Sequence, residues 1–223
     1  RGMSASLIGS LVSDFTMCMT FAHALELMQI YGLRAFYRYL SDDSGEKSKS
    51  ATTRLKNNED LQRMLKKLHE MLYPKPGSDV PYTWGHPKLK KLVTSLSDHF
   101  KAAEAKGEKT KAIVFCNYKI VVNEIVDLLG QCKPQVQAAL FVGQSGGREK
   151  GMPQAKQLQI MKDFRDGKIN CLVATCVAEE GLDIGEVDLA IVLMESQKSP
   201  VRLVQRLGRT GRKRRGRCIV LLS

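Results

Sequence analysis

The sequence predicts an α/β domain, with a parallel sheet and flanking helices, preceded by an all-α region. Two observations lead to this prediction. In residues 1–106, apolar side chains recur every three or four positions, as on one face of a helix. Residues 107–223 instead contain short continuous apolar runs separated by amphipathic segments. Strands that alternate with helices form parallel sheets, so we expect two domains, 1–106 and 107–223.

The helical region begins with an apolar stripe at three- and four-residue spacing, formed by Leu7, Ile8, Leu11, Val12, Phe15 and Met19. The pattern continues to residue 40, with a break expected at Gly32. Residues 41–53 are polar and unpatterned and predict a loop. Two further helices are expected on either side of a proline-rich break, at about 58–72 and 87–105.

In the α/β region, the expected strands alternate with expected helices for most of the chain. Helices are expected at 120–129, at 154–165 and from 201, and residues 143–151 predict a glycine-rich loop. Strands are expected at 111–116, 138–142, 170–174, 189–194 and 218–222, and those at 111–116, 170–174 and 189–194 are expected to be buried. Ligands of parallel sheets bind beyond the carboxyl ends of the strands. We therefore expect the ligand-binding and catalytic residues in the loops at those ends.

Composition narrows the possible partners. The 223 residues carry a net charge of +12, which is typical of a protein that binds nucleic acid or an anionic membrane surface, although a merely soluble basic surface would also account for it. The longest apolar stretches fall short of the ~18 residues that span a bilayer, so no membrane partner is expected. The six cysteines lack CxxC spacing and predict buried, reduced thiols in an intracellular protein, without a metal site.

An arginine-rich segment carries the first chemical signal. It runs Gln205-Arg206-Leu207-Gly208-Arg209-Thr210-Gly211-Arg212. Two guanidinium groups three residues apart, with glycines between them, can reach one phosphate group and bind its oxygens bidentately. Arginines of this kind offset the charge that develops in phosphoryl transfer. The alternative is a basic nucleic-acid-binding tail such as a localisation signal.

A second segment, Val173–Gly185, follows the strand expected to end near Ala174. Thr175 offers a hydroxyl and a backbone N–H to a phosphate, Gly181 permits a tight turn, and Asp183 brings a carboxylate towards a nucleotide. Asp183 alone could be an ordinary turn residue, but its place ahead of the arginine segment strengthens the signal.

Together these segments resemble motifs V (TCVAEEGLDIG) and VI (QRLGRTGR) of superfamily 2 helicases. Ile113–Lys119 is similar to motif IV, and Phe141–Gln144 with Gln157, Phe164, Arg165 and Gly167 is similar to the motif between IV and V. The run at 179–217 resembles the Fanconi anaemia group M / Hef family of DNA translocases. That resemblance implies a RecA-like second motor domain preceded by a helical insert.

The resemblance also implies roles for individual residues. Arg209 and Arg212 would contact the γ-phosphate of ATP, Gln205 would organise that network, and Gly181 and Asp183 would lie beside the nucleotide. Thr175 would hold a DNA phosphate. The residues expected along the tracked strand are Asn117, Lys119, Gln144 and Ser145.

The first motor domain of this family would hold most of the ATP and Mg²⁺. The 223 residues contain neither a GxxxxGK[ST] loop nor a DExH or DEAH box, so this chain alone is not expected to hydrolyse ATP. The expected partner within the same polypeptide is that first RecA-like domain.

Basic side chains in the helical region predict a binding surface for branched or forked DNA. They are Arg54, Lys56, Arg63, Lys66 and Lys67, followed by Lys88, Lys90 and Lys91. A solvated helix face explains them equally well.

The sequence as a whole leaves three functional hypotheses: a nuclear DNA-repair helicase or translocase fragment, an RNA-sensing or RNA-remodelling helicase, and a helical module that recruits DNA-repair proteins.

Overall fold

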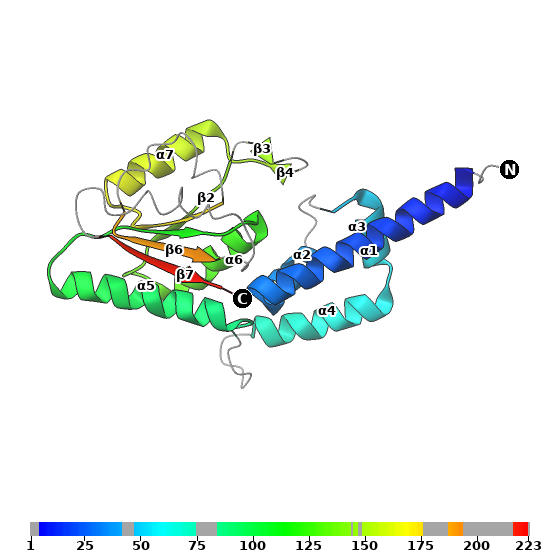
Figure 1. Cartoon of the computed structure of the whole chain (residues 1–223), viewed down its shortest axis with the longest axis horizontal. Coiled ribbons are helices and arrows are strands. Elements are labelled where there is room, and N and C mark those ends of the chain that lie inside the picture. Colours follow the sequence, from blue (N-terminus) through cyan, green and yellow to red (C-terminus); the bar gives the residue numbers. More distant parts are fainter. Residues whose placement is uncertain are drawn as a thin grey trace. The chain divides into compact units, whose positions relative to one another are not determined.

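The computed structural model describes residues 5–41, 47–74, 84–143, 145–146, 149–175, 187–193 and 216–222. Its contacts divide the chain into two compact units, residues 1–85 and 86–223 (Figure 1). The first unit is helical and the second contains the sheet, as the sequence predicts.

Helices α1 (Ala5–Tyr31), α2 (Leu33–Ser41), α3 (Lys49–Lys56) and α4 (Glu59–Leu72) form the helical unit. The expected break at Gly32 is confirmed: its φ of 91° lies in the left-handed region that glycine adopts without strain, and α1 ends one residue before it. The turn lets α2 fold back along the second half of α1, where Ala24, Leu27 and Ile30 are buried.

Helix α3 corrects the prediction of a loop over 41–53. Ser48 caps this helix by accepting a hydrogen bond from the N–H of Ala51 at 3.1 Å. Only Ala51 and Leu55 are buried on α3, so the segment has too few apolar residues to produce a periodic stripe in the sequence. Tertiary packing and a good cap, not periodicity, define this helix.

The first half of α1 exposes its apolar stripe. Leu7, Phe15 and Met19 are 49%, 70% and 72% exposed. The stripe makes Ser6–Tyr31 apolar and long enough to cross a membrane by length and composition alone, and little of its most apolar stretch is buried. This corrects the expectation that no apolar stretch reaches that length: single Ser and Thr residues interrupt the runs without making the helix polar on average.

The second unit is built on a five-stranded parallel sheet with the order β2-β5-β1-β6-β7. Its strands are β1 (Ala112–Phe115), β2 (Ala138–Phe141), β5 (Cys171–Ala174), β6 (Leu189–Leu193) and β7 (Arg217–Leu221). Every residue of β1, β5 and β6 is buried, as expected for central strands covered on both faces.

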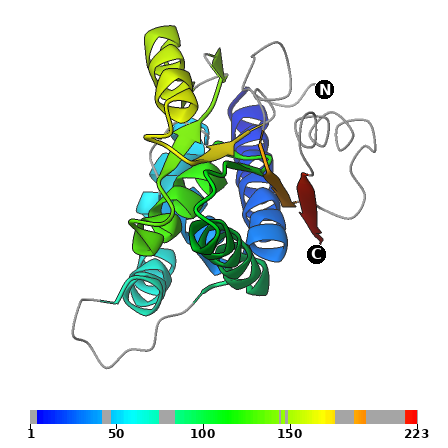
Figure 2. The same cartoon turned by 90° about the vertical axis from the view of Figure 1, so that its left-hand side faces the viewer.

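Helices cover both faces of this sheet. They are α5 (Pro87–Ala105), α6 (Lys119–Leu129), which runs on into the short 3₁₀ turn Gly130–Cys132, and α7 (Gln154–Arg165). The chain moves from β1 through α6 to β2 and returns through α7 to β5, so right-handed crossovers place α6 and α7 on opposite faces. Helix α5 packs beside α6, and Figures 1 and 2 show α7 across the sheet from this pair. The expected parallel sheet with flanking helices is confirmed.

Three details differ from the sequence prediction. The unit that contains the sheet begins at His86, not at 107, because α5 packs against α6 and β6. Residues Ser145–Gly146 (β3) and Glu149–Lys150 (β4) pair as a short antiparallel hairpin within the expected loop. Cys18 and Cys218 are exposed, whereas Cys116 and Cys171 are buried as expected, and burial raises the pKa of Cys171 to about 12. Cys176 lies outside the described residues.

Candidate nucleotide and nucleic-acid site

The carboxyl ends of three strands bring two predicted site residues to one edge of the sheet. Phe115 of β1 and Phe141 of β2 are both in register with Ala174 of β5. Just past these ends, the N–H of Cys116 donates to the carbonyl of Ala174 at 3.0 Å, and the N–H of Thr175 donates to the carbonyl of Phe141 at 3.4 Å. Thr175 therefore stands at the carboxyl edge, beside the chain that continues from β1.

Asn117 follows directly at this edge, and Lys119 is the first residue of α6. Both side chains are half-buried, as is that of Thr175. The backbone of Ser145 lies in β3, where it pairs with Lys150. Gln144 lies outside the described residues.

The residues predicted to face the nucleotide also lie outside the described part of the chain: Gly181, Asp183, Gln205, Arg209 and Arg212. The strands on either side of them are described. Residues 176–186 follow Thr175 at the carboxyl edge, and residues 194–215 follow Leu193 at the end of β6. Strands β5 and β6 therefore both end at the edge where Thr175 and Asn117 lie.

Gln157, which the helicase resemblance includes, has a structural role. Its side chain is buried on α7, and its Nε2 donates to the carbonyl of Val142 at 2.8 Å. This bond holds the chain just beyond β2 against α7 and satisfies a carbonyl that has left the sheet ladder.

Two of the predicted DNA-binding arginines are paired with carboxylates in the helical unit. Nη1 of Arg54 lies 2.8 Å from Oδ1 of Asp14, which joins α3 to α1. Nη1 of Arg63 lies 3.4 Å from Oδ1 of Asp60, on an exposed face of α4. Lys66 and Lys67 are exposed on the same helix. Lys88, in contrast, is buried on α5, so its side chain does not lie on an open basic face.

A polar cluster that the sequence reasoning missed lies at the opposite, amino edge of the sheet. Oγ1 of Thr110 donates to Oδ2 of Asp188 at 3.0 Å, and the N–H of Lys111 donates to the same oxygen at 3.0 Å. Nε2 of His99 lies 2.7 Å from Oγ1 of Thr110. Since the only hydroxyl hydrogen of Thr110 is used on Asp188, the His99 ring donates from Nε2.

This chain of bonds ties α5 to the starts of β1 and β6. Thr110 and Asp188 each come just before a strand, and neighbouring parallel strands begin at the same edge. Their positions just before neighbouring strands could have predicted that Thr110 and Asp188 lie close together. The two residues are too far apart in the sequence, however, to form a recognisable motif. The cluster borders a pocket of about 410 Å³ that Lys106, Lys109 and Arg217 also line.

The His99 cluster predicts a pH-dependent stability. Burial lowers the pKa of His99 from 6.5; the Asp188 carboxylate opposes this and Arg217 adds to it. Because the folded state then takes up a proton less readily than the unfolded state, this contribution is complete above pH 6.5 and is lost as the pH falls through the folded-state pKa. We expect His99→Gln, which keeps a donor but cannot titrate, to show a smaller fall in Tm between pH 7.5 and 5.5 than the wild type. Equal falls in Tm would show that His99 is not the titrating group.

Among the described residues, no group of three or more His, Cys, Asp or Glu side chains could hold a metal ion. The carboxyl edge of the sheet instead presents amide, hydroxyl and amino groups. These are donors to phosphate oxygens.

Comparison with known protein families defines the class of protein. Residues 88–214 match the helicase conserved C-terminal domain. The match covers more than half of the chain, so the chain belongs to this helicase family.

Its relatives place it more narrowly, with the Fanconi anaemia group M / Hef type of superfamily 2. The chain is 39% identical to the Fanconi anemia group M protein homolog of Mus musculus over 96% of its own length and 12% of that protein. It is 38% identical to the ATP-dependent DNA helicase MPH1 of Pyricularia oryzae, over 95% of the chain and 19% of that protein. The crystal structure of the Pyrococcus furiosus Hef helicase domain matches 97% of this chain and 41% of that one, with a TM-score of 0.57 and 32% identity. The chain thus spans a fifth or less of these two curated relatives.

Proposed function

We propose that this chain forms the second motor domain and the helical insert of an ATP-dependent DNA helicase or translocase that remodels branched DNA in nuclear DNA repair. The observation that carries the proposal is the helicase C-terminal domain, with Asn117 and Thr175 together at the carboxyl edge of its sheet. The names of the relatives, a Fanconi anemia group M protein homolog and an ATP-dependent DNA helicase, support the choice of DNA and of ATP.

In this proposal the two segments that leave the carboxyl edge face ATP bound by the first motor domain. Arg209 and Arg212 contact the γ-phosphate, and Gln205 organises their hydrogen bonds. Asp183 lies near the ribose, where Gly181 permits close approach. Mg²⁺ is held mainly by the first domain. This division is consistent with the sequence, which contains the arginine segment but no phosphate-binding loop.

The DNA strand runs past the same edge. Thr175 holds a phosphate, and Asn117, Lys119, Gln144 and Ser145 line its path. Lys119 adds a positive charge at the N-terminus of α6, where the helix dipole also attracts phosphate. None of these groups reads a base, so binding follows backbone shape and charge.

The helical insert supplies a second basic contact with forked DNA through Lys66 and Lys67. Arg54 and Arg63 contribute less, since each is already paired with an aspartate. We expect the double change Lys66→Glu and Lys67→Glu to weaken binding of this chain to forked DNA at least tenfold. The slope of log K against log salt is expected to become shallower by about 1.8, because each phosphate contact on duplex DNA contributes about 0.9. Fluorescence anisotropy over a salt series measures both quantities.

The matched control is Lys101→Glu with Lys156→Glu, which changes the net charge equally on exposed helical positions of the sheet-containing unit. A general charge effect would weaken binding as much in the control as in the test variant. Unchanged binding in the test variant would mean that Lys66 and Lys67 are only solvated. Tighter binding to double-stranded RNA than to forked DNA would favour the RNA-remodelling alternative.

A further inference from the structure

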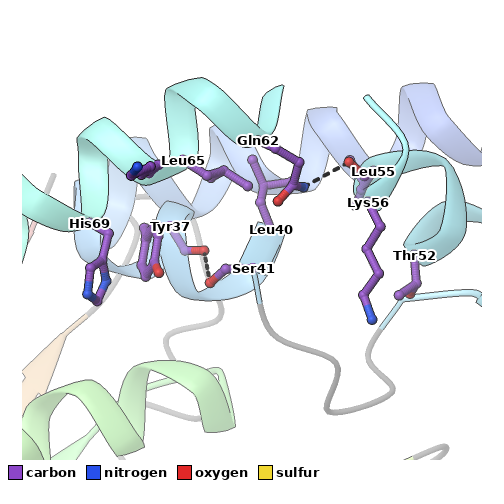
Figure 3. Close-up of a pocket in the computed structure, with 10 residues that line it drawn as sticks. Tyr37, Leu40, Ser41, Thr52, Leu55, Lys56, Gln62, Leu65 and His69 are labelled. Atoms are coloured by element: carbon purple, nitrogen blue, oxygen red, sulfur yellow. Dashed lines mark hydrogen bonds between the residues drawn. The ribbon is translucent and has the colours of Figure 1, made fainter. Parts of the chain in front are cut away.

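A pocket of about 340 Å³ opens between α2, α3 and α4 in the helical unit (Figure 3). This volume lies at the lower end of the range for small-ligand pockets. Its lining combines rings, aliphatic side chains and lysines, so it differs from a simple gap in packing.

Aromatic rings form one end of the pocket. Tyr37 of α2 and His69 of α4 lie side by side with their ring centroids 5.4 Å apart and their planes tilted by 41° (Figure 3). Tyr73, which is not part of the lining, contacts both rings, with its ring centroid 5.7 Å from that of Tyr37 and 5.3 Å from that of His69. His69 is exposed and Tyr37 half-buried, so the pair presents ring surface that is held in place but not covered.

The rest of the lining consists of leucines, two lysines and three neutral polar residues. The polar residues, Ser41, Thr52 and Gln62, each donate a hydrogen bond to a backbone carbonyl. Leu40, Leu55 and Leu65 are buried and form the floor of the pocket. Lys56 ends α3, with an exposed side chain that Figure 3 shows at the far end from His69. Lys66 lines the pocket from α4. Among the residues that the structure describes, none that lines the pocket is acidic.

We infer that this pocket receives one unpaired nucleobase from a single-stranded stretch of DNA. The base stacks on the exposed ring surface of the Tyr37–His69 pair and lies over the leucine floor. The flanking phosphates meet the ammonium groups of Lys56 and Lys66. The inference rests on the proposed function, which it deepens by naming a single-strand contact in the helical insert.

The chemistry of the lining favours a nucleotide over a buried peptide side chain. Proteins that hold single strands without reading sequence combine a cationic path for the backbone with aromatic rings for the bases, and this pocket has both within one lining. An apolar peptide side chain would use the leucines and rings but not the two lysines. The net charge of +12 adds attraction for a polyanion.

The test compares a 12-residue oligothymidylate with an abasic oligomer of the same length, each labelled with fluorescein and titrated with the 223-residue chain. We expect His69→Ala to weaken binding of oligothymidylate by about 5- to 150-fold and binding of the abasic oligomer little, because one stacked base contributes about that factor. His69→Phe keeps a ring and is expected to restore binding. The paired change Lys56→Gln and Lys66→Gln is expected to weaken binding of both oligomers.

Lys67→Gln is the control, since Lys67 neighbours Lys66 but does not line the pocket. It should leave the ratio of the two affinities unchanged. Equal weakening of both oligomers by His69→Ala, or no rescue by His69→Phe, would overturn the base-stacking site. A wild-type chain that binds an apolar peptide but neither oligomer would also overturn it. If the chain failed to bind forked DNA as well, the proposed function itself would fail; intact fork binding with an unchanged affinity ratio would reject the pocket alone.

Discussion

Replacing Arg209 or Arg212 with alanine is expected to lower kcat for DNA-stimulated ATP hydrolysis by about 10³- to 10⁵-fold, when this chain is joined to a first motor domain that binds ATP. The guanidinium groups would offset charge on the transferring phosphoryl group, so their loss affects the transition state more than ATP binding. Lysine is expected to rescue little, because an ammonium group lacks the planar fork that binds two phosphate oxygens. Steady-state ATPase assays with saturating DNA measure the effect.

Arg214→Ala provides the matched control, since this arginine lies just beyond the helicase motif and is expected to leave kcat within a fewfold of wild type. The 223-residue chain alone is expected to show no DNA-stimulated hydrolysis, because its sequence has no phosphate-binding loop. Robust hydrolysis by the chain alone would contradict the division of the active site between two domains. A kcat that survives loss of both arginines would remove their proposed role.

Arg34→Ala is expected to destabilise the helical unit by about 3 kcal/mol, because it leaves a buried carbonyl without its partner. Arg34 is buried on α2, and its Nη2 donates to the carbonyl of Leu72 at 2.6 Å. Leu72 ends α4, where backbone carbonyls lack helical partners and the helix dipole favours a cation. The guanidinium also lies 4.7 Å from the ring centroid of Tyr73.

Urea unfolding measures this loss, and Trp84, the only tryptophan in the sequence, reports on the helical unit by fluorescence. Arg63→Ala is the control, because its exposed ion pair with Asp60 is expected to contribute less than about 0.5 kcal/mol. A similar midpoint for Arg34→Ala and wild type would show that the helical unit does not depend on the contacts of Arg34.

Gly85→Ala should destabilise the helical unit as well. Gly85 has φ +76°, and an added Cβ would lie 3.2 Å from Cγ of Arg34.

The elements most accurately predicted have local signals at their ends. Helix α5 begins at Pro87, which is favourable in a first turn, and α7 ends two residues before Gly167, whose φ of 80° stops it. The buried strands were recognisable because both faces of the sheet are covered. Helix α3 was missed because it depends on Ser48 and two buried apolar residues. The unit boundary was misplaced because the packing of α5 against the sheet leaves no mark in its helical periodicity.

The site was predictable only where the chemistry is contiguous in sequence. Thr175 and Asn117 belong to short motifs, and parallel strand order brings them to one edge. The His99–Thr110–Asp188 chain and the Tyr37–His69 pocket assemble from separate elements, so only tertiary structure reveals them. The same holds for the pairing of Arg54 with Asp14, 40 residues away, which changes a predicted DNA contact into a link between helices.

The exposed half of α1 has a consequence for handling the protein in solution. A charge of +12 keeps copies apart at low ionic strength, whereas the apolar side chains from Leu7 to Met19 draw them together. Added salt screens the repulsion within about 10 Å at 0.1 M but leaves the hydrophobic attraction in place. The colloidal stability of the isolated chain should therefore fall as salt rises, over the same range in which its DNA affinity is titrated. Light scattering recorded alongside each salt series distinguishes weaker DNA binding from self-association of the chain.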